Sequence, residues 1–312
     1  MARGIAPGSR HGPAAGHPRP RRRRRARKPH RGDAGRADRR DGADRVTAAG
    51  AAASVQRGIA GGAVRRDRRV SAPRRVLHEP AWLLHHRPWS DAGRILEFVT
   101  RGHGRVTLFA RGVRRPESRL RGLLQPFLPL LVSWSGRADG GTLTGAEIAG
   151  TWTTLPSDRL MSGFYLNELL LRLLPREERH DRVFDGYAAA LATLAAEAPA
   201  RALRIFELLL LEELGYGLAL THEADSGTPL DPDRYYHFRP GQGLLAVRDE
   251  VPGATALPGR DLLAVATGAL DDERALAAAR RVLRAALGHC LDGRGLHSRE
   301  VMLALSRLER ST

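Results

Sequence analysis

Residues 93–112 read GRILEFVTRGHGRVTLFARG. They contain two runs of apolar and β-branched residues, 94–101 and 104–112, typical of β-strands, and His103-Gly104 between them indicates a tight hairpin. Similar runs, separated by Gly, Pro, Asp or Ser, lie at 81–87, 127–135 and 142–150. Five short strands so close together predict a small closed barrel, and the OB-fold is a five-stranded barrel of that size. Trp82, Phe98 and Trp134 lie within these strand patterns and are expected in its core.

Beyond residue 150 the apolar residues recur at helical spacing. The run 158–174 predicts a helix with Ser157 as its N-cap and Pro175 at its end. Further helices are expected at 181–198, 200–214, 271–288 and 298–309. Residues 221–247, rich in Gly, Pro and Asp, indicate an inserted β-hairpin. The predicted fold is therefore α+β: an N-terminal five-stranded OB-fold β-barrel at 76–152, followed by an α-helical domain with an inserted hairpin at 153–312.

The charge of the chain is concentrated in its first quarter. The 312 residues carry a formal net charge of +17, and residues 1–75, with 22 Lys and Arg against 5 Asp and Glu, account for all of it. This segment has no aromatic residue and no leucine, so we expect it to be disordered. Two interpretations stay open. The segment is either a polycationic arm, centred on Arg21–Arg25, Arg27 and Lys28, that binds nucleic acid through counterion release, or sequence upstream of a true start at Val70 or Val76.

No familiar catalytic motif is found in the sequence. Its one lysine, Lys28, lies in the basic segment, which excludes a P-loop and Schiff-base chemistry in the folded part. Its one cysteine, Cys290, excludes an internal disulfide and a four-cysteine zinc site. His222-Glu223 lacks the second histidine of a zinc-protease motif. No apolar run reaches the roughly 18–20 residues of a membrane helix. We expect a protein that is not an enzyme and does not span a membrane.

The run 104–112 and the loop after it have the pattern of a nucleic-acid-binding surface. One face of the strand alternates cation, hydroxyl, ring and cation: Arg105, Thr107, Phe109 and Arg111. Arginines bind phosphates, and an aromatic ring stacks on a base, each stacked base contributing roughly 1–3 kcal/mol. The loop adds Arg114, Arg115, Arg119 and Arg121. The alternative is that Phe109 packs under the helical domain and the arginines only keep the loop solvated.

Five stretches carry a resemblance to a known family. They are GRILEFVTRGHGRVTLFARGVRRPESRLRGLLQPFLPLLVSWSG (93–136), LTGAE (143–147), GFYLNELLLRLLPREERHDRVFDGYAAAL (163–191), RIFELLLLEELGYGLAL (204–220) and HSREVMLAL (297–305). The first two resemble the N-terminal OB domain of RecO, the bacterial recombination mediator and DNA repair protein, and the others resemble its C-terminal domain. The resemblance extends over essentially all of the foldable chain.

This resemblance implies a non-enzymatic mediator of DNA repair and homologous recombination. RecO proteins bind single- and double-stranded DNA and anneal complementary strands. They also contact the C-terminal tail of single-stranded DNA-binding protein (SSB) and, with RecR, help to load RecA onto gapped DNA, with RecF and RecA as indirect partners. A cytoplasmic, nucleoid-associated location follows from these partners. The family's DNA contacts carry over to Arg105, Arg111, Arg114, Arg115, Arg119 and Arg121, and more weakly to Arg94.

The hairpin region departs from the family pattern. Many RecO proteins hold zinc there with four cysteines, whereas residues 221–247 contain none. His222 and His237 alone do not make a tetrahedral site. We expect no metal and no cofactor, and a degenerate zinc-finger-like hairpin held by packing around Tyr235, Tyr236 and Phe238.

Two questions about partners stay open at this level. An acidic SSB tail needs an apolar pocket rimmed by cations, which could be supplied by Arg172, Arg176, Arg179 and Arg204. The alternative is that these arginines pair with Glu168, Glu177 and Glu207. A rival function is a protein-interaction adaptor whose barrel is only a scaffold, and such an adaptor would tolerate neutralisation of the loop 114–121.

Overall fold

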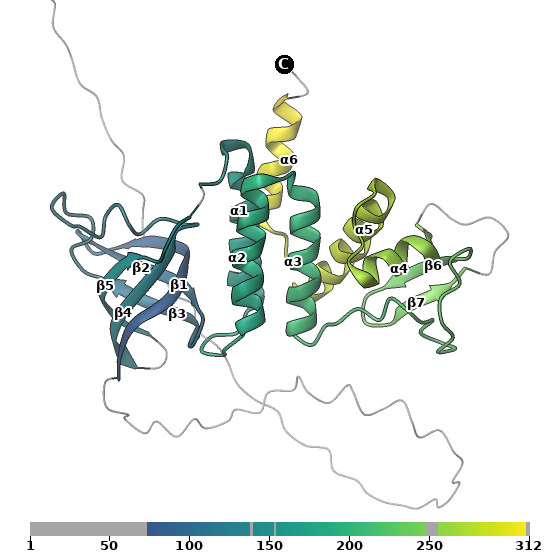
Figure 1. The fold of residues 1–312 in the computed structure, drawn as a ribbon, viewed down its shortest axis with the longest axis horizontal. Coiled ribbons are helices and arrows are strands. Elements are labelled where there is room, and N and C mark those ends of the chain that lie inside the picture. Colours follow the sequence, from purple (N-terminus) through teal and green to yellow (C-terminus); the bar gives the residue numbers. More distant parts are fainter. Residues whose placement is uncertain (1–73, 138–139, 153, 248–254, 310–312) are drawn as a thin grey trace, which may run out of the picture. The chain divides into compact units, whose positions relative to one another are not determined.

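The computed structural model describes residues 74–137, 140–152, 154–247 and 255–309 (Figure 1), and all of these residues belong to one compact unit. Of the basic segment predicted at residues 1–75, only Arg74 and Arg75 belong to the described residues, and they begin the first strand. The expected disorder of the rest lies outside the described residues.

Five strands close into a barrel in the order β1-β2-β3-β5-β4. The strands are β1 Arg74–Trp89, β2 Gly93–Thr100, β3 Gly104–Ala110, β4 Pro129–Arg137 and β5 Gly140–Ile148. The long strand β1 pairs with β4 through its first half and with β2 through its second half. Strands β3 and β5 run parallel, and the pairing covers only three residues of each. The predicted five-stranded barrel is confirmed, and β1 is longer than the expected run 81–87.

The barrel interior is filled by alternate residues of its strands. On β3, Val106, Leu108 and Ala110 are buried, so the residues between them face outward. Phe98 and Trp134 are also buried in this core, as predicted.

A second core joins the barrel to the helices. Trp82 and Leu84 on β1 pack into it, and Trp82 meets Tyr187 edge to face with ring centroids 5.6 Å apart. Asn167 donates a buried hydrogen bond to the Leu84 carbonyl (2.9 Å) and accepts one from the Tyr187 hydroxyl. The predicted burial of Trp82 is confirmed, but the residue belongs to this second core and not to the barrel interior.

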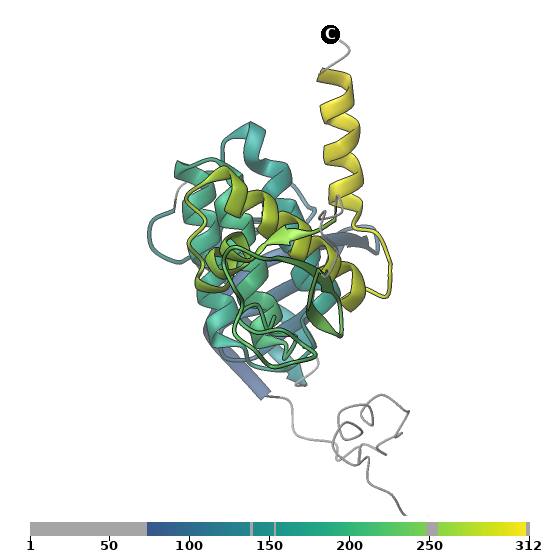
Figure 2. The same ribbon diagram turned by 90° about the vertical axis from the view of Figure 1, so that its right-hand side faces the viewer.

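Within the described ranges six α-helices follow; the last of them, α6, is yellow in Figures 1 and 2. They are α1 Leu160–Leu173, α2 Asp181–Ala196, α3 Pro199–Glu213, α4 Gly259–Thr267, α5 Glu273–Cys290 and α6 His297–Glu309. The predicted Ser157 cap is wrong, because Ser157 is the first residue of a short 3₁₀ turn and the N-cap of α1 is Arg159. The sequence reasoning also missed α4, a two-turn helix that begins at Gly259 and ends before Gly268.

A small sheet of order β7-β6-β8 lies in the helical region. Its strands are β6 Tyr235–Arg239, β7 Gly243–Ala246 and β8 Leu257–Pro258, so the predicted hairpin is confirmed and gains a third strand. Tyr236 is fully buried and its hydroxyl accepts a hydrogen bond from the Asp231 backbone (2.9 Å). Tyr235 is 40% exposed, because neighbouring residues of a strand face opposite ways. Packing around Tyr235 was therefore wrongly expected.

Candidate nucleic-acid interface

The outward face of β3 is divided between two environments. Its first half contacts the helical region: the Arg105 guanidinium donates to the Leu171 carbonyl, and that of Arg176 donates to the Thr107 hydroxyl and to Glu97 (3.1 Å). Burial, and then the charge of Arg176, lower the pKa of Arg105. Arg105 therefore differs from the other predicted DNA contacts, because its side chain is already engaged within the protein.

Backbone contacts reinforce the same junction. Arg105 forms a parallel β-bridge with Arg176, and the Glu177 N–H donates to the Arg105 carbonyl (3.2 Å). Gly104 lies against the backbone of Glu178 so closely that a Cβ at this position would clash with it. These contacts join the barrel firmly to the segment between α1 and α2.

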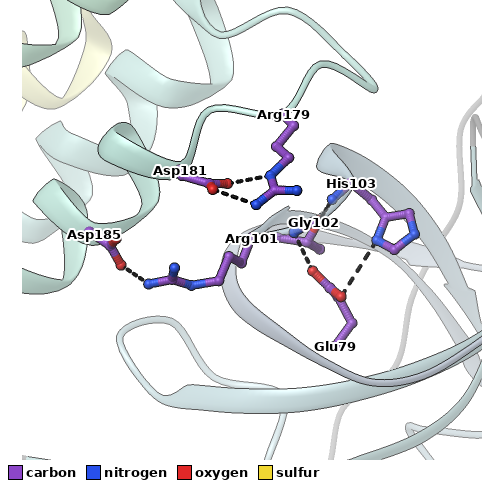
Figure 3. A network of polar contacts seen from close by, with 8 residues as sticks. Glu79, Arg101, Gly102, His103, Arg179, Asp181 and Asp185 are labelled. Carbon is purple, nitrogen blue, oxygen red and sulfur yellow. Dashed lines mark hydrogen bonds and ion pairs between the residues drawn. The ribbon is translucent and has the colours of Figure 1, made fainter.

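The hairpin between β2 and β3 is tied to α2 by a polar network (Figure 3). The Glu79 carboxylate accepts a hydrogen bond from the Gly102 N–H and lies 3.6 Å from the His103 ring nitrogen. Arg101 bonds Asp185 and places its guanidinium 5.4 Å from the centre of the Phe184 ring. The hairpin connection predicted at His103-Gly104 thus also fixes the barrel on the helices.

The second half of the β3 face is open. Phe109 is half-buried and packs edge to face against Trp89, with ring centroids 5.2 Å apart and planes at 61°. Trp89 is 38% exposed. Phe109 does not belong to the core that the barrel shares with the helices. The alternative that it packs under the helical domain is therefore wrong. Sequence reasoning missed Trp89, although the tryptophan directly before the Ser90-Asp91 turn was a visible signal.

The loop after β3, residues 111–121, is called the arginine loop below. Its five arginines are all exposed: Arg111, Arg114, Arg115, Arg119 and Arg121. Within the described part of the chain, none of these five guanidinium groups pairs with a carboxylate. Val113 and Leu124 are buried in the barrel core, and the Arg114 N–H donates to the Ala92 carbonyl (2.9 Å). The backbone of the loop is thereby anchored while its charges face solvent. Arg94, the weaker expectation, is half-buried at the start of β2.

The four arginines considered for the SSB tail all make ion pairs. The pairs are Arg172 with Glu168 (3.3 Å), Arg176 with Glu97 (3.1 Å), Arg179 with Asp181 (2.5 Å) and Arg204 with Glu207 (2.8 Å). The alternative based on ion pairs with Glu168 and Glu207 is confirmed. The pairing with Glu177 was wrong, because Arg176 turns toward the barrel.

Glu207 is a buried acidic residue, and one of its two carboxyl oxygens lacks a partner among the described residues. The residue is fully buried, its Oε1 accepts from the Tyr165 hydroxyl (2.5 Å), and its Oε2 has no partner among the described residues. Burial raises the pKa of Glu207, although Arg204 opposes the shift.

A cluster of arginines lies close to Glu207. Burial and then the charge of Arg284 lower the pKa of Arg299, and Arg204 and Arg280 contribute in the same direction. Arg280 and Arg284 on α5 are exposed. Among the residues that the structure describes, Arg280, Arg284 and Arg299 form no salt bridge, although the charge of Arg299 acts to lower the pKa of Glu207. We call these three residues the α5–α6 arginine cluster.

Helix α6, which carries Arg299, is held at its start by a residue of α1. The Glu168 carboxylate accepts from the His297 N–H (3.0 Å), the Ser298 N–H (2.8 Å) and the Ser298 hydroxyl (2.7 Å). Burial would raise the pKa of Glu168, but these hydrogen bonds and Arg172 lower it overall. Farther along α6, Leu303 and Leu305 are each 45% exposed.

Two observations concern possible metal ligands and the one cysteine. They contain no group of three or more His, Cys, Asp or Glu side chains placed to hold a metal ion. Burial raises the pKa of the Cys290 thiol, which disfavours the reactive thiolate. Over the same residues, no helix has the length and apolarity needed to cross a membrane.

Comparison with known proteins agrees with this architecture. The family model "Recombination protein O N terminal" matches residues 75–152, and "Recombination protein O C terminal" matches residues 157–300. The chain is 41% identical over 239 residues to the DNA repair protein RecO of Aromatoleum aromaticum, covering 77% of this chain and 100% of that protein. It is 44% identical over 235 residues to the RecO of Methylococcus capsulatus, covering 75% and 96%. It is also 44% identical over 225 residues to that of Serratia proteamaculans, covering 72% and 92%. The chain therefore belongs to the RecO family, and its role lies in DNA repair and recombination.

Proposed function

We propose that this chain is a recombination mediator that binds single- and double-stranded DNA through its barrel, residues 76–152, and protein partners through its helical domain, residues 153–312. The observation that carries the proposal is the arginine loop. Its five exposed guanidinium groups, unpaired within the described residues, lie next to the outward-facing Phe109 on an OB-type barrel. Arginines in such a position bind phosphates by releasing counterions.

Strand annealing follows from the same charges. Two complementary strands repel each other through their phosphates, and arginines that neutralise one backbone lower that repulsion while the bases stay free to pair. Arg111, Arg114, Arg115, Arg119 and Arg121 supply the phosphate contacts, with Phe109 beside them. Arg105 serves the junction with the helical region, since its guanidinium is bonded to Leu171.

The test is a salt series of DNA binding for a variant in which all five loop arginines are Gln. Each neutralised phosphate contributes a log–log slope of about −0.7 on single strands and −0.9 on duplex. The variant should bind more weakly, and its slope on single strands should flatten by up to about 3.5. The matched control removes the same net charge elsewhere, with Gln at Arg182, Arg201, Arg234, Arg239 and Arg260, all exposed in the helical region.

Equal affinity and slope for the loop variant and the parent protein would contradict the proposal and favour the adaptor. Equal affinity and slope would also be found if the protein bound DNA through residues outside the barrel, which contradicts the proposal as well. A loss of the same size in the control would also contradict it, because the effect would then come from net charge and not from the arginine loop.

For the protein partners, we assign the acidic SSB tail to the α5–α6 arginine cluster, because Leu303, one helical turn after Arg299 on α6, is exposed. Like charges close together favour a bound anion, and an exposed leucine favours an apolar side chain of a peptide. Binding of a labelled SSB-tail peptide should be lost when Arg280 and Arg284 are both Ala, while DNA binding persists. RecR binding, and loading of RecA on SSB-coated DNA with RecR, complete the proposed activity in the cytoplasm at the nucleoid.

A further inference from the structure

Beside the open half of the outward β3 face, the barrel wall (the outer surface of its strands) carries an aromatic pair that is held in place. Trp89 ends β1 and lies over Gly93, its cross-strand partner on β2. A Cβ at Gly93 would lie 2.9 Å from Cε3 of Trp89, so only glycine leaves room for the indole there. Phe109 packs against the indole edge to face. The indole is thus fixed against the wall while more than a third of the residue stays exposed.

Strand register places cations on both sides of this pair. Arg87 on β1 pairs with Ile95, which pairs with Phe109, so the three side chains form one row on the wall. Arg111 follows Phe109 by two residues along the chain. Arg87 and Arg111 are both exposed, and in the described ranges neither has a carboxylate partner.

The wall beside Phe109 is hollowed. The shallow depression there is lined by Thr107, Ser135, Thr142 and Arg176 and by the backbone of Gly136, Gly140 and Gly141. Because Gly136, Gly140 and Gly141 have no side chains, the depression is lined there by backbone atoms alone. A planar group that stacks on the aromatic pair has room to lie on this side of it.

We propose that Trp89 and Phe109 form a stacking platform for unpaired nucleobases, which makes this face of the barrel prefer single-stranded to double-stranded DNA. The inference rests on the proposed function, because it names what the DNA-binding face distinguishes. Phosphates are present in both forms of DNA, so the arginines contribute to both. The faces of bases are accessible only where they are unpaired and unstacked, so the aromatic pair contributes only to single strands.

The test compares Trp89→Leu with Trp152→Leu in the full chain. Trp152 is a matched control, because it is 44% exposed and lies outside the strands of the barrel. Probes are a fluorescent oligothymidylate and a blunt duplex with the same number of phosphates on the labelled strand. Trp89→Leu should weaken oligothymidylate binding about 5- to 150-fold, the loss of one stacked base, and change duplex binding less than twofold. Trp89→Phe should restore most of the loss, and Trp152→Leu should change neither affinity.

Tryptophan fluorescence gives a second readout, which does not require the Trp89→Leu variant to fold. In Trp152→Leu, three tryptophans remain, and Trp82 and Trp134 are buried. Oligothymidylate should therefore quench Trp89, and the duplex should not. Unchanged oligothymidylate affinity, or an equal loss on both probes, overturns the platform. The proposed function survives that result if the five-arginine variant still loses both probes, and it fails separately if that variant binds like the parent.

Discussion

Replacing Glu168 by Ala should release the start of α6 from α1 without unfolding the rest of the protein. The Glu168 carboxylate accepts three hydrogen bonds from His297 and Ser298, two of them from backbone N–H groups of the first turn. It acts as an N-cap supplied by another helix, and the N–H groups of a first turn have no partner within their own helix. Without the carboxylate, these groups must find water.

The size of the effect follows from those contacts. Loss of an N-cap costs about 0.5–2 kcal/mol, and hydrogen bonds to a charged group contribute about 1.5–3 kcal/mol. The Glu168 side chain is 15% exposed, so water replaces its bonds only in part. We expect local opening of α6 to become easier by about 2 kcal/mol, or about 30-fold in the opening equilibrium.

Hydrogen exchange measured peptide by peptide is the suitable assay, because it separates local from global opening. Amides of residues 299–309 should exchange about 30-fold faster in Glu168→Ala, while those of α5 stay protected. Asp272→Ala is the matched control: Asp272 caps α5 through the Ala275 N–H (2.7 Å) and should loosen α5 alone. Equal protection of α6 in the parent and in Glu168→Ala would refute the capping role.

Three further predictions concern the two cores and the acid response. Gly104→Ala should lower the free energy of unfolding in urea by about 1–3 kcal/mol or more, because Gly104 has a φ of +64° and abuts the Glu178 backbone; an unchanged midpoint would contradict this. Glu207→Ala should cost about 3–5 kcal/mol in the same assay, because it leaves Arg204 half-buried without its partner, and a cost below about 1 kcal/mol would argue against a buried ion pair there. The folded protein holds the pKa of Glu168 below its ordinary 4.5. Glu168 should therefore stabilise α6 fully above pH 4.5, and this stabilisation should be lost as the pH falls through the lowered pKa of the folded state. Hydrogen exchange of the α6 amides in Glu168→Ala should lack this acid dependence.

The barrel could be predicted from sequence because its strands are short, alternating and bounded by turn residues. The run 104–112 shows this directly, since the buried and outward residues of β3 alternate as expected. Strand β1 was underestimated because its first half contains His78, Glu79 and Pro80, which suit no strand pattern. Pairing with β4 holds that half in the sheet despite a register shift near these residues.

The site was predictable only where it depends on local sequence. The loop arginines are exposed, as an Arg-rich loop suggests. The engagement of Arg105 was not predictable, because its acceptor, the Leu171 carbonyl, is 66 residues away in the chain. Trp89 was overlooked because its contribution depends on Phe109, a neighbour only through the pairing of three strands.

The contact between Arg105 and the segment at Arg176 has a consequence for synthesis of the chain. Strand β5 covers only Thr107–Phe109 of β3, and the Glu177 N–H supplies a bond to the stretch before them. During synthesis the five strands leave the ribosome about thirty residues before the segment at Arg176. Until that segment follows, the nascent barrel exposes an unpaired strand edge, which can pair with other chains. Cutting the protein at the boundary near residue 152 would make that transient edge permanent. We therefore expect the two halves to fold as one unit, with the strand edge covered only once Arg176 and Glu177 have emerged.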